Sequence, residues 1–127
     1  MSKVIGIGGI LFKSKNPSAL RDWYKKYLGF DAQDWGCRFD WNVPEGKEFY
    51  SVWSPFKDDT NYFSPSDKPF MINLIVDDLD ALTEQLHLEG ITVSGKTGET
   101  EFGKFGWILD PENNKLELWE PPKAAHN

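Results

Sequence analysis

The sequence predicts an α+β fold in which two βαβββ repeats pair into a curved, cup-like mixed sheet with the helices outside. Three observations lead to this prediction. The length of 127 residues suits one domain. A strand, a helix and short strands follow one another twice along the chain. The two halves also match in detail, SALRDWYKKYLGF with DALTEQLHLEGI and YSVWSP with LELWEP.

A single domain is therefore expected over residues 1–127. Its two repeats cover about 4–60 and 70–121. The polar, proline-bearing segment 61–69 joins them as a linker. One repeat alone would leave a face of its sheet uncovered, so we expect the two to fold together.

The first repeat opens with an apolar strand over 4–14 and continues with a helix. Asn16 is the expected N-cap, Pro17 the first helical residue and Gly29 the C-terminal stop. The helix has one apolar stripe, formed by Leu20, Trp23, Tyr24, Tyr27 and Leu28.

Three short strands should complete the first repeat. They are expected over 30–34, 37–43 and 48–53. Pro44-Glu45-Gly46 has the composition of a turn and would join the last two strands.

The second repeat follows the same plan. A strand over 70–76 leads to a helix capped by Asp77-Asp78 and ended by Gly90. Three more strands follow, over 91–93, 104–109 and 115–119, and the last two are joined by DPENN. In that turn Asn113 can adopt a positive φ.

The glycines of VIGIGGILF, residues 4–12, raise the question of a dinucleotide-binding turn. Such a turn places its glycines between a strand and the start of a helix. Here they precede Ile10, Leu11 and Phe12 and so lie inside the strand, while the helix begins only after Asn16-Pro17. A dinucleotide site is therefore rejected.

The amino-acid composition limits which partners the protein can be expected to bind. A net charge of −6 weighs against nucleic acid and anionic membranes, both of which attract clustered Lys and Arg. Cys37 is the only cysteine, which rules out an intrachain disulfide, and we interpret it as a small core residue. The sequence has no signal-peptide pattern and no long apolar run, so we expect a cytoplasmic protein.

Three segments carry a family resemblance: the strand-helix-Leu-Gly-Phe start, VDDLDAL, and the ending WILDPENNKLELWEP. Over about 4–121 the chain resembles the vicinal oxygen chelate superfamily, which includes glyoxalase I, bleomycin-resistance proteins and extradiol dioxygenases. Asn113 stands where that family usually has glycine. The resemblance implies a glyoxalase-like fold and a homodimer. It leaves open whether each cup is built within one chain or between two.

The resemblance also implies a divalent metal on the cup floor, held by the first and last strands of each repeat. Carried over residue by residue, the ligand positions are Gly9, Ser51, Met71 and Glu117. Only Glu117 is a good ligand, and a catalytic zinc usually needs three. Neither His87, on the second helix, nor His126, in the C-terminal tail, is placed to reach the cup. We therefore expect no metal and no cofactor, with a weak cation at Glu117 beside Asn73 as the alternative.

Strand alternation gives a separate estimate of the cup lining. It turns Glu117 and Trp119 inward with Lys115. It also turns inward Ile7, Gly9, Leu11 and Lys13 of the first strand, Ser51 and Trp53, and Met71, Asn73 and Ile75. Glu117 is the candidate catalytic residue. The candidate ligand-binding residues are Trp53, Asn73, Trp107, Trp119, Met71, Ser51 and Arg38.

Three functions fit these residues. The first is a metal-free protein that binds an amphipathic or cationic small molecule in an aromatic cup. The second is an enzyme of the same superfamily, a lyase, isomerase or dioxygenase, that uses an atypical metal or Glu117 as general base. The third is a structural or protein-interaction role, with the cup filled by its own Trp and Met71 side chains. Glu117 could also form an ion pair with Lys13, Lys115 or Arg38, and its protonation state stays open.

Overall fold

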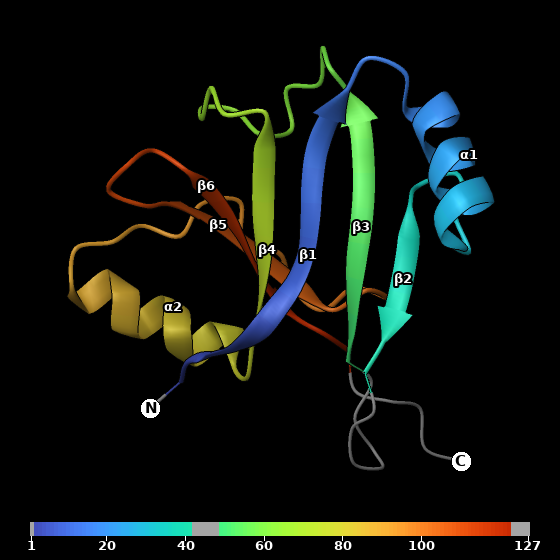
Figure 1. Cartoon of the computed structure of the whole chain (residues 1–127). Helices are drawn as coiled ribbons and strands as arrows, with labels where there is room; N and C mark the ends of the chain where they lie inside the picture. The colour runs from blue at the N-terminus through green and yellow to red at the C-terminus, as the bar shows by residue number, and fades with distance from the viewer. Residues whose placement is uncertain (1, 42–48, 123–127) are drawn as a thin grey trace, which may run out of the picture.

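The computed structural model describes residues 2–41 and 49–122. Its six strands form one mixed sheet in the order β2-β3-β1-β4-β6-β5 (Figure 1). The strands are β1 (Val4–Ser14), β2 (Cys37–Asp40), β3 (Tyr50–Lys57), β4 (Phe70–Val76), β5 (Lys104–Leu109) and β6 (Lys115–Glu120), and the helices are α1 (Pro17–Leu28) and α2 (Leu79–Leu88). The predicted α+β class with a curved mixed sheet is confirmed.

The centre of the sheet is the antiparallel pair of β1 and β4. On either side each has a parallel neighbour, β3 for β1 and β6 for β4. The outer strands β2 and β5 then run antiparallel to those neighbours. The two halves of the sheet therefore have the same strand order when read outward from the β1–β4 seam, and both belong to one chain.

Two of the short strands that the sequence predicts do not form. Segment 30–34 contributes only an isolated bridge between Gln33 and Gly36, and 91–93 is followed by a single bridge between Ser94 and Trp107. Phe30 instead packs its ring against aromatic side chains of α1 and β3. That packing is a tertiary contact, so local strand propensity does not predict it.

The remaining strand predictions meet a mixed outcome. In segment 37–43 the described strand is Cys37–Asp40, and residues 42 and 43 lie outside the described part of the chain. Segment 48–53 corresponds to β3, which continues to Lys57. The turn at 44–46 lies outside the described residues. In the second repeat β4 and β5 have the predicted bounds, and β6 is one residue longer.

Local chemistry sets the ends of the helices as predicted. The Asn16 side chain accepts a hydrogen bond from the Ala19 amide, and Gly29 ends α1 at φ 71°. At α2, Asp78 accepts from the Ala81 amide. These contacts satisfy backbone groups that a helix end leaves without partners.

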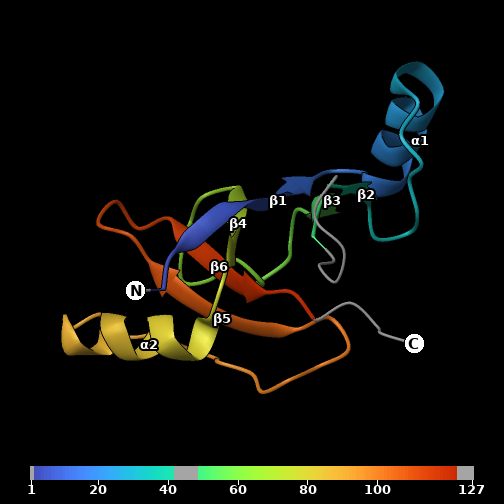
Figure 2. The ribbon, with the colours of Figure 1, turned by 90° about the horizontal axis from the view of Figure 1, so that it is seen from below.

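Both helices lie outside the curve of the sheet, α1 beside β2 and β3 and α2 beside β5 and β6 (Figure 2). The α2 helix packs through Leu79, Leu82 and Leu86 against Val76 and Leu118. No described helix is long and apolar enough to cross a membrane.

The α1 helix is held more loosely. None of its residues is buried, and it meets the sheet mainly through Tyr24, whose ring lies 4.5 Å from that of Trp53. Trp23, Tyr27 and Leu28, at 50 %, 60 % and 57 % exposure, stay largely open to solvent. The predicted apolar stripe of α1 is thus only partly covered.

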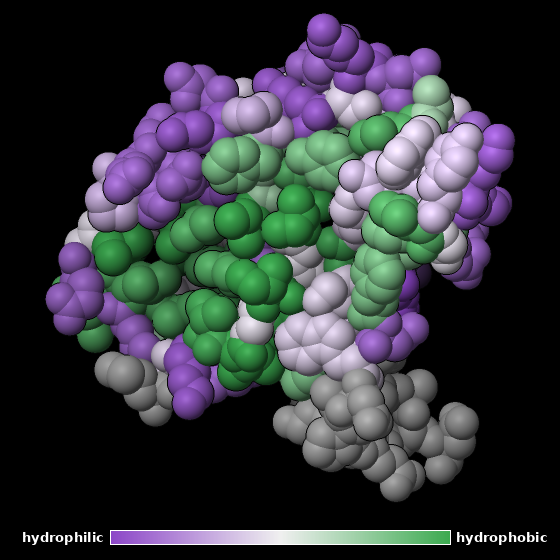
Figure 3. Space-filling view, in the orientation of Figure 1, coloured by the Kyte–Doolittle hydropathy of each residue, from purple (hydrophilic) through white to green (hydrophobic). Residues whose placement is uncertain are grey.

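The convex face of the sheet between the two helices is apolar (Figure 3). Leu11 and Asn73 line the concave side, so their strand neighbours Ile10, Ile72 and Leu74 face the other way. Ile7 and Ile10 are 51 % and 43 % exposed. This face, defined here by Ile7, Ile10, Ile72 and Leu74, is called the convex patch below.

Candidate functional site

A β-bulge in β1 shapes the concave side. Ile7 lies opposite Leu74 and Gly9 opposite Asn73, so Gly8 is an extra residue on β1. The bulge turns Ile7 onto the convex face, and the prediction that Ile7 points into the cup is wrong. A bulge changes the alternation of a strand, and nothing in the apolar pattern of residues 4–12 marks its position.

The bulge glycines make room for neighbouring side chains. A Cβ on Gly8 would lie 2.0 Å from Asn73 Oδ1, and a Cβ on Gly9 would lie 2.5 Å from Val52 Cγ2. Side chains at these two positions would displace the groups that now fill the space. The glycine-rich strand is therefore explained by close packing on the floor of the cup.

Glu117 is the centre of a hydrogen-bond network. It is only 4 % exposed. Asn73 Nδ2 donates to Oε1 at 2.7 Å, Trp107 Nε1 donates to Oε2 at 3.0 Å, and the Tyr62 hydroxyl also donates to Oε2. Three neutral side chains therefore hold its two oxygens in place.

Register brings this network together. Asn73 on β4 and Trp107 on β5 both lie opposite Glu117 of the intervening β6. Alternation along each strand then points all three side chains to the concave side. Trp107, a candidate site residue from the sequence, thus lies beside Glu117 across the DPENN turn.

Tyr62 is a site residue that the sequence analysis missed, because it lies in the linker. Burial and the negative charge of Glu117 raise the pKa of the Tyr62 hydroxyl well above its usual range. The next residue, Phe63, is 1 % exposed and packs against Leu11 and Met71. The linker thus fills one end of the cup. The only sequence signal for this was two aromatic residues in an otherwise polar segment.

Lys115 ties the linker to β6. Its Nζ donates to the Tyr62 carbonyl oxygen at 2.8 Å and lies 5.6 Å and 5.7 Å from the ring centres of Tyr62 and Trp107. Burial lowers the pKa of Lys115. This lysine stabilises the closed end of the cup.

The other end of the cup holds a cavity of about 440 Å³. Glu117 and Asn73 belong to its polar lining together with Arg38, whose guanidinium lies 3.7 Å from the Tyr50 ring centre and whose Nε donates to Asp40 at 2.8 Å. Five aromatic residues line it: Trp35, Tyr50, Phe102, Phe105 and Trp119. The Phe105 and Trp119 rings are nearly parallel, 7° apart at a distance of 6.1 Å. Such a wall suits a flat, mostly apolar small molecule.

Comparison with sequence-family models and with curated proteins finds no match. Solved structures do match. Methylmalonyl-CoA epimerase from Streptomyces coelicolor aligns over 94 % of this chain and 99 % of its own, with a TM-score of 0.67 at 14 % identity. The same enzyme from Mycobacterium tuberculosis covers 94 % and 89 %, with a TM-score of 0.58 at 16 % identity.

Catechol 2,3-dioxygenase aligns with 98 % of this chain, which spans 41 % of the dioxygenase, with a TM-score of 0.62 at 20 % identity. Both enzymes are vicinal oxygen chelate proteins. The chain has the vicinal oxygen chelate fold. At these identities the likeness shows the fold, and the chemistry has to be argued from the site itself.

In this vicinal oxygen chelate fold four of the predicted site residues line the cavity: Arg38, Asn73, Glu117 and Trp119. Trp107 lies behind them, bonded to Glu117. Met71 is fully buried under Phe63 and Leu11, so no ligand in the cavity can touch it without displacing the linker.

Two predicted site residues lie elsewhere. Trp53 packs on the convex side against Phe12, Tyr24 and Phe30, and the prediction that it lines the cup is wrong. Ser51, two residues before Trp53 on β3, points to the same convex face. Its Oγ donates to the Ile7 carbonyl at 2.8 Å.

The error comes from aligning YSVWSP with LELWEP residue by residue. In the sheet Gly9 pairs with Val52, whereas Asn73 pairs with Glu117, so Val52 is the counterpart of Glu117. Tyr50 and Val52 therefore line the cavity where Ser51 and Trp53 were expected. A tryptophan stands at the same place in both motifs but packs against α1 in one repeat and lines the cavity in the other.

The side chains at the expected metal positions do not form a metal-binding set. Gly9 and Val52 offer no ligand, and both oxygens of Glu117 already accept hydrogen bonds from protein donors. Among residues 2–41 and 49–122 no three His, Cys, Asp or Glu side chains are placed to hold one ion. The described donors therefore do not fit a catalytic metal.

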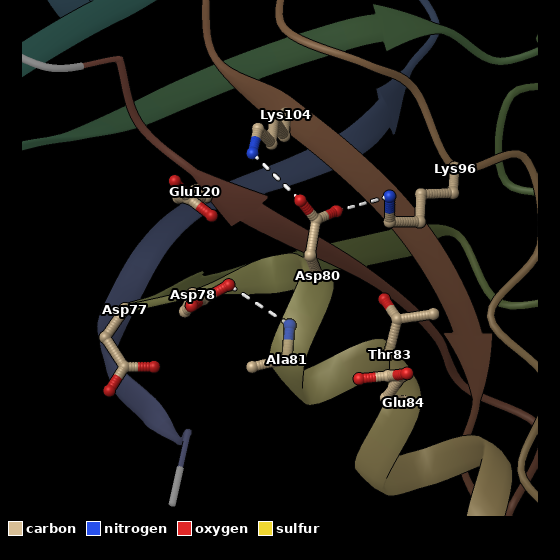
Figure 4. Close-up of a pocket in the computed structure, with 9 residues that line it drawn as sticks. All are labelled: Asp77, Asp78, Asp80, Ala81, Thr83, Glu84, Lys96, Lys104 and Glu120. Carbon is tan, nitrogen blue, oxygen red and sulfur yellow. Dashed lines mark hydrogen bonds and ion pairs between the residues drawn. The ribbon is translucent and has the colours of Figure 1, made fainter.

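A second hollow lies at the start of α2 (Figure 4). Its acidic lining residues are Asp77, Asp78, Asp80, Glu84 and Glu120. Asp80 accepts from Lys96 at 2.5 Å and Lys104 at 3.1 Å, and these bonds lower its pKa. Asp78 caps the helix, and Glu120 Oε1 accepts from the Leu79 amide at 2.8 Å. Asp78 fixes the start of α2, and Lys104 and Glu120 tie the helix to β5 and β6, so we interpret this hollow as structural.

Proposed function

We propose that the protein is a metal-free small-molecule-binding protein of the glyoxalase and bleomycin-resistance type. The observation that carries this proposal is the aromatic cavity beside a buried, fully hydrogen-bonded Glu117. Its walls offer apolar and aromatic surface, and its floor offers a few fixed polar groups. That combination is typical of ligand sites.

An amphipathic ligand is better supported than a cationic one. Both oxygens of Glu117 already accept hydrogen bonds from protein donors, which leaves them few positions for direct contact with a cation. Arg38 also brings a positive charge to the cavity wall. An apolar body with one polar end matches both features.

Calorimetric titration with 2-naphthol, a flat amphipathic probe, tests the proposal. We expect saturable binding that is the same with and without a metal chelator. Phe105→Ala should weaken it at least tenfold, because the variant removes one of the two parallel rings. The matched control is Trp23→Ala, on the outer helix, which should bind as the unmodified protein does. Binding that disappears with chelator would contradict the metal-free assignment.

The alternative is an enzyme of the same fold with Glu117 as general base or with an atypical metal. It is favoured by the solved neighbours, which are an epimerase and a dioxygenase. A Glu117 that lines the cavity and bonds Tyr62 also favours it. Turnover of a 2-oxoaldehyde–thiol adduct with added Ni, Zn or Mn, lost in Glu117→Gln, would establish this alternative.

A homodimer built on the convex patch is also part of the proposal. The patch is aliphatic, and α1, which also lies outside the curve of the sheet, has Trp23 and Tyr27 half-exposed. An uncharged sheet face packs well on a second such face. In a two-fold symmetric dimer both chains use the same surface, and the central antiparallel strands β1 and β4 would lie at the middle of that interface. Each cup would then be complete within one chain.

Sedimentation analysis tests the dimer. The double variant Ile7→Lys, Ile10→Lys should be monomeric, because four buried lysines would face one another across the interface. Leu88→Lys, at an 84 % exposed position at the end of α2, is the control and should sediment like the unmodified protein. A cytoplasmic location and the absence of a nucleic-acid partner stay predictions from the sequence.

A further inference from the structure

We propose that the ligand of the cavity carries an N–H or O–H group that donates a hydrogen bond to Asn73 Oδ1. This inference rests on the proposed function and names the chemical class of its ligand. Asn73 lines the cavity and is 3 % exposed. Its Oδ1 is a buried polar atom that has no hydrogen-bond partner among the described residues.

The orientation of the Asn73 amide is fixed by its other end. Nδ2 donates to Glu117 Oε1 at 2.7 Å. A reversed amide would set two acceptor oxygens against each other at that distance, which is unfavourable. Oδ1 is therefore the atom directed away from Glu117. Because buried acceptors are nearly always paired in folded proteins, this one points to a missing donor.

The bulge sets the surroundings of this oxygen. Oδ1 lies 2.0 Å from the position that a Gly8 Cβ would take, and Ile75 Cγ1 and Trp119 Cε3 lie 2.9 Å and 3.0 Å from the same position. These three groups fill the space that a Gly8 side chain would need. Asn73 and Trp119 also line the cavity, so a ligand donor would reach Oδ1 from that side with a shift of the Trp119 ring.

These surroundings define the ligand. Its ring would lie along the parallel Phe105 and Trp119 rings, with a donor on its edge next to Asn73. Both oxygens of the nearby Glu117 are hydrogen-bond acceptors, which disfavours a negative group at that edge. Neutral phenols and ring N–H compounds such as indoles meet these requirements. An ether of the same shape does not, because it would leave Oδ1 unpaired.

The test compares 2-naphthol with 2-methoxynaphthalene, which has the same rings but no donor. On the unmodified protein 2-naphthol should bind about tenfold more tightly, as expected for one buried hydrogen bond. In Asn73→Leu the two should bind alike. Phe105→Ala should weaken both and keep the preference, because it changes the aromatic wall and leaves Asn73 in place.

The outcomes separate the two proposals. If neither compound binds the unmodified protein, the proposed function fails and this inference fails with it. If both compounds bind equally, the proposed ligand-binding function is supported and the proposed hydrogen bond to Asn73 is overturned. Should Asn73→Leu not fold, the side-chain carbonyl ¹³C resonance of Asn73 replaces it. That resonance should move downfield with 2-naphthol and stay in place with the ether, and equal shifts would also overturn the inference.

Discussion

At Gly8 a single methyl group would meet the Asn73 amide oxygen at 2.0 Å. That contact is shorter than any real carbon–oxygen contact, so the amide must move and its bond to Glu117 must weaken. We expect Gly8→Ala to lower the free energy of unfolding by about 1–3 kcal/mol, the usual cost of overpacking. Urea denaturation measures it.

Gly98 supplies the control for that substitution. A Cβ there meets nothing within 4 Å, and its φ is not positive. Gly98→Ala should therefore leave stability unchanged or raise it slightly, because alanine reduces the entropy of the unfolded chain. A Gly8→Ala protein as stable as the Gly98→Ala control would mean that the bulge tolerates a side chain.

Tyr62 should make stability depend on alkaline pH. Its pKa is raised in the folded protein, so the unfolded chain loses this proton first as the pH rises through about 10. The protonated Tyr62 hydroxyl contributes fully to the free energy of unfolding below that pH. The contribution is lost progressively as the pH rises from there toward the higher pKa of the folded protein. Urea denaturation between pH 8 and 11 should show the loss, and Tyr62→Phe should show a shallower one. Identical slopes in the two proteins would contradict the Tyr62–Glu117 contact.

At the scale of elements, the helix ends could be predicted from neighbouring residues. The orientation of the strand side chains depends on the long-range register of the sheet. Asn16, Gly29 and Asp78 act through neighbours within a few residues, so their roles could be predicted from the chain. Trp53 could not be oriented, because its direction depends on which residue of β3 lies opposite Gly9. Tyr62 could not be placed at all, because its partner is 55 residues away.

The N-cap of α2 gives the prediction for this scale. Asp78→Ala removes the acceptor of the Ala81 amide, and the free energy of unfolding should fall by about 1 kcal/mol. Asp78→Asn keeps an acceptor and loses only the charge near the positive helix end, so its effect should be smaller. Two equal losses would mean that the charge, and not the hydrogen bond, stabilises this end.

At the scale of the whole molecule, the cup is half filled by its own linker and half open. Phe63 fills one end at 1 % exposure, whereas Phe102 lines the other at 58 %. The structural role considered from the sequence therefore describes one end of the cup, and the ligand-binding role the other. The sequence could not show this division, because the segment 61–69 has the composition of a surface loop.

Two matched substitutions separate the ends. Phe63→Ala should lower the free energy of unfolding by about 3–5 kcal/mol, because it leaves a hole among Leu11 and Met71. Phe102→Ala should change stability by less than about 0.5 kcal/mol and weaken 2-naphthol binding. Thermal unfolding and calorimetry measure both. A stable Phe63→Ala protein would mean that the linker is not part of the core.

The β1–β4 seam also has a consequence for biosynthesis. While the first half of the chain is being synthesised, one edge of β1 can pair with β3. The other edge stays unpaired until β4, Phe70–Val76, has left the ribosome. During that interval an apolar strand presents unpaired backbone groups, which is the condition under which nascent chains associate wrongly. Chains stalled before residue 70 should therefore be captured by chaperones, and chains released after residue 127 should not.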